Sequence, residues 1–260
     1  MHQRVRANVR QILGPKASDA DVERLARSQW RNYMRYLRDF AALPRIARSE
    51  TERIFERAEG WEHIDRAMSQ GRGLVLASVH FGNWDLAAGT MARRHPVNVI
   101  ADTFSSRLLD GFVNRRRKAL GVQVIPVEKA LKRTVSALRR NESVAFLVDK
   151  PLAGDAGVDV EFFGRRTRIP AGAAYFASRT GAPLIAAFVW RNEHGDFRVQ
   201  VFPPIQVDPD VKTTMQQVIR VAEQVIRAHP EQWYMFRSMW STSQEVGGTV
   251  DVDLTEEAVA

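Results

Sequence analysis

The segment HFGNWD holds an imidazole at His80 and a carboxylate at Asp85, directly after the apolar run 74–79. Gly82 lets the backbone turn sharply and can bring Asp85 back toward His80. A carboxylate bound to one imidazole nitrogen leaves the other nitrogen to act as a general base. Such a base can take a proton from an alcohol that attacks an acyl group. The alternative is a structural histidine with Asp85 as a helix cap, the commoner situation for an isolated His-x4-Asp pair.

A second polar group begins at Asp149 and Lys150, after an apolar stretch that ends at Val148. It continues past a glycine-containing loop to three arginines in four positions, namely Arg165, Arg166 and Arg168. Guanidinium groups bind phosphate and other anions bidentately, and Pro170 is placed to open a helix whose N-terminus also attracts anions. We therefore expect a substrate-binding region here, and we add Asn83 to it. A solvated basic loop is the alternative.

A third group is the segment 229–236, in which Pro230 ends a helix and several aromatic residues follow. Aromatic clusters of this kind pack a core more often than they bind a ligand. The six histidines show no paired spacing typical of a metal site, so no metal is predicted.

Apolar runs alternate with helical patterns through most of the chain. The predicted strands are 74–79, 97–101, 122–126, 143–148, 158–163, 182–190 and 197–202. The predicted helices are 61–69, 84–94, 105–120, 128–140, one from Pro170 and 213–228. This alternation favours an α/β fold with a mainly parallel, buried central sheet flanked by helices. Gly195 and Asp196 predict a hairpin turn between the last two strands.

The first 48 residues contain 11 Lys or Arg and 4 Asp or Glu, most of the net charge of +8. A helix is predicted from Ser18 to about Pro44, with arginines on one side and an apolar stripe that includes Trp30, Met34 and Leu37. It is either a core-facing helix with a solvated arginine face or a surface for anionic lipid. We assign residues 1–60 to a basic helical segment packed on the core, 61–240 to the α/β core and 241–260 to a disordered acidic tail, within one domain overall.

The composition limits the chemistry that is available. With no cysteine in 260 residues, thiol nucleophiles and Cys-ligated metals are excluded. No apolar run approaches the roughly 18–20 residues that span a bilayer, and the basic start lacks the apolar core of a signal peptide. We therefore expect a soluble or membrane-surface protein.

Several motifs occur together in one order. They are His80-x4-Asp85, Val158-x-Val-x-Phe-Phe-Gly164, Pro170-Ala-Gly172, Thr180-Gly-Ala182 and His229-Pro-Glu-Gln-Trp233. As a set over residues 1–240, they resemble the bacterial lipid A biosynthesis lauroyl/myristoyl acyltransferase family, which includes phosphatidylinositol mannoside acyltransferases. The resemblance implies a fold like that of the glycerolipid acyltransferases. It also implies transfer of an acyl group from acyl-CoA or acyl-carrier protein to a glycolipid hydroxyl, with no cofactor.

The resemblance also implies residue roles. His80 becomes the general base with Asp85 as its partner, and a second acid precedes Phe-Phe-Gly, either Glu161 or Asp159, with Glu161 slightly favoured. Lys150 stands where an arginine is common. The resemblance also implies that the chain acts as a peripheral protein at the cytoplasmic face of the inner membrane, on an anionic lipid surface.

Two departures from the family pattern are visible. The apolar N-terminal anchor expected of the family is missing, and Phe-Phe-Gly-Arg-Arg stands where glycerolipid acyltransferases have Phe-Pro-Glu-Gly-Thr. The second departure argues against a glycerol-3-phosphate acceptor. Two alternatives stay open: a non-catalytic binder of anionic membrane or nucleic acid through the basic face, and a hydrolase built on the same dyad. No nucleic-acid module is recognised, so nucleic acid is not the expected partner.

Overall fold

Seven strands form a sheet in the order β1-β9-β8-β2-β5-β3-β4, and two more form a separate hairpin, β6-β7. The computed structural model describes residues 2–43, 52–54, 56–152 and 157–240. The strands are β1 (Ala58–Glu59), β2 (Leu74–Ser78), β3 (Val97–Ala101), β4 (Val122–Pro126), β5 (Ser143–Leu147), β6 (Val158–Phe162), β7 (Arg165–Ile169), β8 (Leu184–Arg191) and β9 (Phe197–Val201). Among the described strands of the seven-stranded sheet, β8 and β9 are the one antiparallel pair of neighbours, so β1 and β9 run opposite to the other five. The predicted mainly parallel sheet is confirmed.

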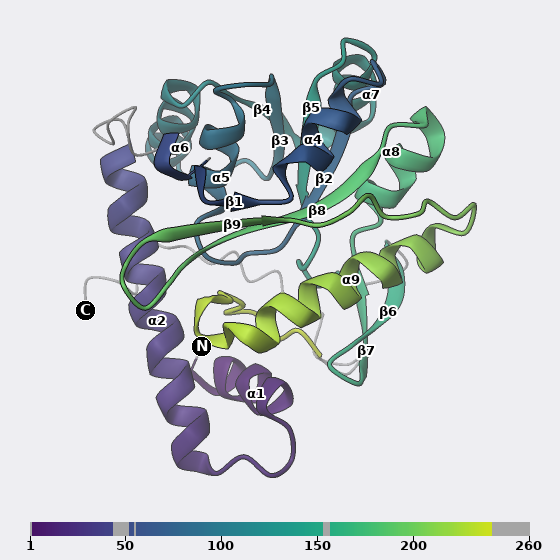
Figure 1. Cartoon of the computed structure of the whole chain (residues 1–260). Coiled ribbons are helices and arrows are strands. Elements are labelled where there is room, and N and C mark those ends of the chain that lie inside the picture. The colour runs from purple at the N-terminus through teal and green to yellow at the C-terminus, as the bar shows by residue number, and fades with distance from the viewer. Residues whose placement is uncertain (1, 44–51, 55, 153–156, 241–260) are drawn as a thin grey trace.

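Helices cover both faces of this sheet (Figure 1). The helices are α1 (His2–Leu13), α2 (Asp19–Ala42), α4 (Trp61–Met68), α5 (Trp84–Met91), α6 (Arg107–Ala119), α7 (Ala130–Arg139), α8 (Gly172–Thr180) and α9 (Val211–Ala228), with short 3-10 turns η2 (Val127–Lys129) and η3 (Pro230–Gln232). One apolar core lies under α7, α8 and α9, and another lies under α4, α5, α6 and the end of α2. A third, smaller core lies between α1 and α2.

The central strand β2 contributes side chains to the cores on both faces of the sheet. Val75 and Ala77 belong to the core under α8 and α9, whereas Leu74 and Leu76 belong to the opposite one. Since successive side chains of a strand point to opposite faces, a strand buried on both sides must be apolar throughout. This is why 74–79 reads as an unbroken apolar run.

The carboxyl ends of the parallel strands meet at one edge of the sheet, which we call the carboxyl edge. Strands β2 and β5 are neighbours in full register, with Ser78 opposite Leu147. Strands β3 and β4 end together, with Ala101 opposite Pro126. Side chains that follow these strands are therefore neighbours in space although they are far apart in the chain.

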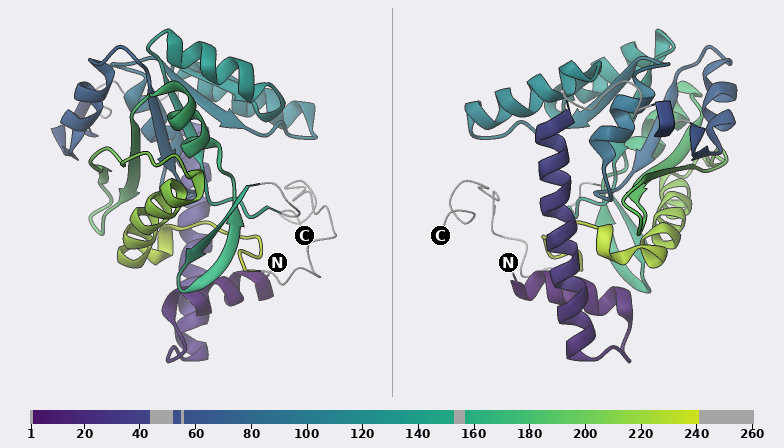
Figure 2. Two further views of the ribbon diagram at one scale, coloured as in Figure 1. Left: turned by 90° about the vertical axis from the view of Figure 1, so that its right-hand side faces the viewer. Right: turned by 60° about the vertical axis from the view of Figure 1, so that its left-hand side comes forward.

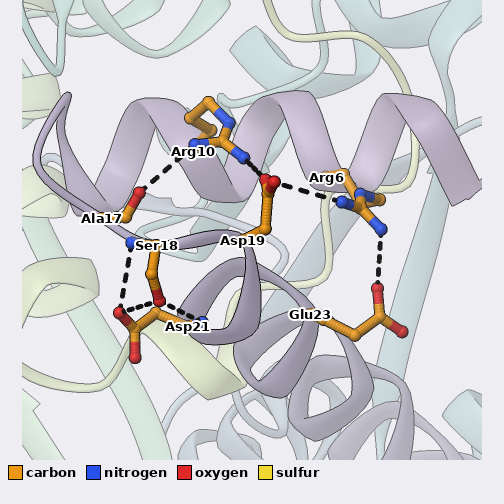
Figure 3. A network of polar contacts seen from close by, with 7 residues as sticks. All are labelled: Arg6, Arg10, Ala17, Ser18, Asp19, Asp21 and Glu23. Carbon is orange, nitrogen blue, oxygen red and sulfur yellow. Dashed lines mark hydrogen bonds and ion pairs between the residues drawn. The ribbon is translucent and has the colours of Figure 1, made fainter.

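The first two helices pack against each other, and α2 also packs against η3. Asp19 lies between Arg10 and Arg6, and Arg6 also binds Glu23 at 3.0 Å, so three charge contacts join α1 to α2 (Figure 3). Ser18 caps α2 in a capping box with Asp21, as its position before the acidic first turn predicts. The long α2 runs beside the rest of the molecule (Figure 2).

The side chains of α2 show which face of this helix is buried. Trp30 stacks on Phe236 at 4.2 Å between ring centroids, and Leu37 packs against the core. Met34 is 58% exposed, so the expected stripe of Trp30, Met34 and Leu37 does not form one surface. The helix is a core-packing helix whose outer face carries arginines.

The structure confirms one further prediction about the strands and corrects two others. The hairpin turn between β8 and β9 is confirmed. The arginines expected in a basic loop instead form strand β7, and α8 begins at Gly172 rather than at Pro170. Helix α1 was not predicted as a separate element within the basic helical segment 1–60, and strand β1, with two residues, is too short to be recognised from the sequence. The predicted helix end at Pro44 and the tail 241–260 lie outside the described residues. No helix in the described part of the chain is long and apolar enough to cross a bilayer.

Candidate active site

His80 follows β2 at the carboxyl edge and contacts the first residues after β5. Its Nδ1 lies 2.8 Å from Oδ1 of Asp149, and its backbone N–H donates to Oδ2 of the same carboxylate at 3.0 Å. Asp149 is fully buried, whereas the His80 side chain is 35% exposed. Within the described part of the chain Nε2 of His80 has no hydrogen-bond partner. The pair has the geometry of a base oriented by a buried carboxylate.

Trp233 completes the surroundings of Asp149. Its indole N–H donates to Oδ2 at 2.9 Å, so the buried carboxylate accepts three hydrogen bonds. A buried carboxylate without such partners would be costly to keep charged. The indole therefore supports a negative charge behind His80. Trp233 itself is fully buried, as expected of a core aromatic.

The segment that contains Trp233 also holds the backbone around His80. Tyr234 donates its N–H to the carbonyl of His80 at 2.8 Å, and Gly82 donates to the carbonyl of Gln232 at 2.9 Å. The Gln232 side chain in turn donates to the carbonyl of Arg191 at 2.7 Å and accepts from its N–H. The segment 232–234 thus joins the His80 turn to the end of β8.

Gly82 is needed for this arrangement. Its φ of +58° is a conformation that side chains disfavour, and a Cβ there would lie 1.8 Å from the carbonyl oxygen of Val189. The glycine that sequence reasoning used to fold Asp85 toward His80 instead lets the turn lie directly against β8.

Asp85 does not contact His80 as expected. It is 3% exposed and accepts hydrogen bonds from the Tyr36 hydroxyl at 2.7 Å and from Nε of Arg117 at 2.8 Å. It lies in the first turn of α5, and its carboxylate joins α5 to α2 through Tyr36 and to α6 through Arg117. Burial, and next the charge of Asp85, raises the pKa of Tyr36 well above its usual value, which keeps that phenol protonated as a donor.

The contacts of Asp85 change what its substitution should do. Asp85→Asn leaves the Arg117 guanidinium without a counter-charge in a largely buried site, so we expect a loss of about 3 kcal/mol in the free energy of unfolding. Denaturant unfolding measures this, and Arg117→Gln should give a similar loss with less than additive effects in the double variant. A sharp fall in activity per folded molecule with unchanged stability would instead favour Asp85 as the partner of His80.

Two further candidates have structural contacts. Asn83 caps α5 through its Oδ1, which accepts from the N–H of Leu86 at 3.0 Å. Its buried Nδ2 has no partner among the described residues, and it lines a cavity of about 10 Å³, room for at most one water. Lys150 forms an ion pair with Asp102, which joins the ends of β5 and β3. Their substrate-binding roles stay predictions.

The acidic and basic residues of the hairpin β6-β7 pair with one another. Asp159 binds Arg168 at 2.9 Å and Arg166 at 2.5 Å, and these contacts lower the pKa of Asp159 far below its usual range. Glu161 is exposed and lines an open hollow of about 600 Å³ with residues of α9. Neither Asp159 nor Glu161 is brought into contact with His80. Arg165 is exposed, and it makes no ion pair within the described part of the chain.

Sequence reasoning placed Asp149 among binding residues and missed its contact with His80. The signal was present, because both residues directly follow buried strands. The sequence does not reveal the order of strands in the sheet, which makes β2 and β5 neighbours. Among the described residues, no group of three His, Asp or Glu side chains gathers as metal ligands would.

Comparison with known proteins agrees with the motif resemblance. The family model for bacterial lipid A biosynthesis acyltransferases matches residues 1–242. A phosphatidylinositol mannoside acyltransferase of Mycobacterium tuberculosis is 32% identical over 245 residues, 92% of this chain and 77% of that protein. A lipid A biosynthesis lauroyltransferase of Escherichia coli is 25% identical over 190 residues, 72% of this chain and 62% of that protein. The chain therefore belongs to the bacterial lipid A biosynthesis acyltransferase family.

Proposed function

We propose that the protein transfers a fatty acyl group from an acyl thioester to a hydroxyl of a membrane glycolipid, with His80 as the general base and Asp149 as the residue that orients it. The observation that supports this most is the contact between the half-exposed imidazole and the fully buried carboxylate. The family and the names of the two relatives support the reaction class and the glycolipid acceptor.

The proposed reaction is a direct transfer. The Asp149 carboxylate holds the proton on Nδ1, so Nε2 presents a lone pair. Nε2 takes the proton from the acceptor hydroxyl as its oxygen attacks the thioester carbonyl carbon. The new C–O bond forms, the C–S bond breaks, and the leaving thiolate takes the proton back from His80. Asp149 stabilises the imidazolium in between, as the acid of a serine-hydrolase triad does.

The donor, expected to be acyl-CoA or acyl-carrier protein, and the acceptor are part of this proposal. A phosphatidylinositol mannoside and a lipid A precursor are the two acceptor classes that the relatives' names suggest. The hydrolase alternative differs in one step, since water would replace the acceptor hydroxyl. The alternative of a non-catalytic binder of anionic membrane or nucleic acid predicts no thioester cleavage at all.

A thiol-release assay separates these possibilities. Purified protein is mixed with acyl-CoA or acyl-carrier protein, with and without glycolipid extracts containing phosphatidylinositol mannosides or lipid A precursors. The proposal predicts thiol release that depends on one of the acceptors. Equal release without acceptor would indicate a hydrolase, and no release with any pair would indicate a binder.

We further propose that the protein works as a peripheral protein on an anionic inner-membrane surface, helped by the arginines of α2. Five of them lie on its exposed side, namely Arg24, Arg27, Arg31, Arg35 and Arg38. Arg31 and Arg35 make no ion pair within the described residues, while Arg27 binds Glu23 at 2.9 Å. Each arginine near an anionic surface contributes about 1 kcal/mol at low salt.

Charge reversal tests the α2 face. We expect Arg27→Glu/Arg31→Glu/Arg35→Glu to weaken sedimentation with phosphatidylglycerol vesicles by at least about 100-fold at 0.1 M salt, because three attractions of about 1 kcal/mol become repulsions. Turnover of a detergent-dispersed acceptor should persist, since the His80 contacts are untouched. The matched control makes the same charge change at the edge of the sheet opposite the carboxyl edge, with Arg72→Glu/Arg93→Glu/Arg179→Glu. Equal sedimentation of the α2 variant and the control would exclude this face.

A further inference from the structure

Three of the six large apolar side chains exposed by the described residues lie at the carboxyl edge of the sheet. Leu108 is 87% exposed in the first turn of α6, Leu131 is 60% exposed in the first turn of α7, and Val127 is 50% exposed in η2. Helix α6 follows β3 and η2 follows β4, and those strands end side by side. Among the described residues, the two most exposed leucines thus both follow strands that end at this edge, Leu108 at the start of the helix on one face of the sheet and Leu131 at the start of the helix on the other. A lipid interface that meets this edge can take up exposed leucines from the starts of both helices.

Cations surround these apolar side chains. Arg107, Lys129, Lys132 and Arg133 are all exposed. None of the four makes an ion pair within the part of the chain that the structure describes. Glu128 is the one acid in the segment 127–133, and Asp102 at the end of β3 is already paired with Lys150. The local charge is therefore positive and available to an anionic partner.

This edge is also the edge of the candidate active site. The strand that leads to His80 is separated from β4 by β5 and β3. At about 4.8 Å per strand, the ends of β2 and β4 lie about 14 Å apart. A lipid surface that touches the ends of β3 and β4 would therefore bring headgroups within reach of His80.

We propose that Arg107, Leu108, Val127, Lys129, Leu131 and Lys132 form a docking surface for anionic membrane, the carboxyl-edge patch. Apolar side chains that project singly between cations match a lipid interface, where the acyl boundary takes the apolar groups and the headgroups take the charge. The inference rests on the proposed function in that membrane contact here delivers a lipid hydroxyl to His80. At this patch apolar side chains would insert into the lipid, in addition to the salt-sensitive attraction that we expect from the arginines of α2.

Site-specific fluorescence tests insertion directly. Because the chain has no cysteine, Val127→Cys can be labelled with an environment-sensitive dye such as NBD at that position alone. With vesicles of 30% phosphatidylglycerol and 70% phosphatidylcholine, we expect a blue-shifted emission that nitroxide-labelled lipid quenches. The same dye at Leu13→Cys, an exposed leucine at the end of α1, should keep its emission in water. A label at Val127 that stays water-like while the protein sediments with the vesicles would overturn the proposal.

Vesicle partitioning provides the second test. Leu108→Ser/Leu131→Ser should lower the partition coefficient about 100-fold, since each leucine withdrawn from the acyl boundary costs about tenfold. Both residues are exposed, so the melting temperature should match that of the wild type, and Leu13→Ser is the control for a lost exposed leucine. Unchanged partitioning would overturn the proposal, as would a loss of binding to soluble acyl-carrier protein with vesicle binding intact. Neither readout requires turnover, so failure of the proposed acyl transfer would be recognised separately.

Discussion

His80→Ala is expected to lower acyl transfer by about 10²–10⁴-fold, because it removes the only base that the proposed mechanism uses. The His80 side chain is 35% exposed and contacts the Asp149 carboxylate and the Trp84 ring, at 5.3 Å between ring centroids. Its loss leaves one oxygen of Asp149 without a partner, so some loss of stability is expected beside the loss of rate. Thiol release from the donor, normalised to folded protein, measures the rate. Circular dichroism and the melting temperature establish that the variant is folded.

His80→Gln is the useful companion, because its amide can still donate to Asp149 and so keeps the buried carboxylate partnered. It cannot serve as a base, so the rate should fall as far as it does in His80→Ala. Near-normal turnover in either folded variant would refute the mechanism.

Asp149→Asn is expected to lower the rate by about 10³–10⁴-fold, by analogy with the acid of a serine-hydrolase triad. Asp149 accepts hydrogen bonds on both oxygens, from His80 Nδ1 on one and from His80 N–H and Trp233 on the other. An asparagine has one donor end, which must face one of these groups. If it faces Nδ1, the imidazole proton moves to Nε2 and the base is lost. The rate with saturating donor and acceptor reports the effect.

Asp85→Asn provides the matched comparison, since it makes the same chemical change at the other buried carboxylate near His80. The structure predicts a large rate effect with Asp149→Asn and a large stability effect with Asp85→Asn. Asp149→Glu keeps the charge, so it should recover part of the activity that asparagine loses. If Asp149→Asn were folded and as active as wild type while Asp85→Asn were inactive, Asp85 and not Asp149 would be the residue that orients His80.

Much of the fold could be predicted, because apolar runs of buried parallel strands are distinct from helical periodicity. The strands from β2 to β5 and the hairpin β8-β9 lie close to their predicted ranges. The β7 strand was harder to recognise. Its sequence, RRTRI, is dominated by arginine, and it forms because Thr167 and Ile169 are buried while Asp159 binds the arginines beside it.

The site was only half predictable, for a topological reason. His80 and Asp149 were both recognisable as polar residues after buried strands. The contact between them depends on β5 lying next to β2, although β3 and β4 come between them in the chain. Local spacing favoured Asp85, but its carboxylate is occupied by Tyr36 and Arg117, which come from distant helices.

Mass spectrometry of the lipid product distinguishes acyl transfer by His80 and Asp149 from hydrolysis and from simple binding. Wild-type protein, His80→Ala and Asp149→Asn would each be incubated with an isotope-labelled acyl thioester and a glycolipid acceptor, either a phosphatidylinositol mannoside or a lipid A precursor. We expect the wild type to form a glycolipid that carries the labelled acyl group in an ester, in equal amount to the thiol released. Both variants should form almost none. Labelled free fatty acid with no acylated glycolipid, or ester formation that persists in His80→Ala, would contradict the proposed mechanism.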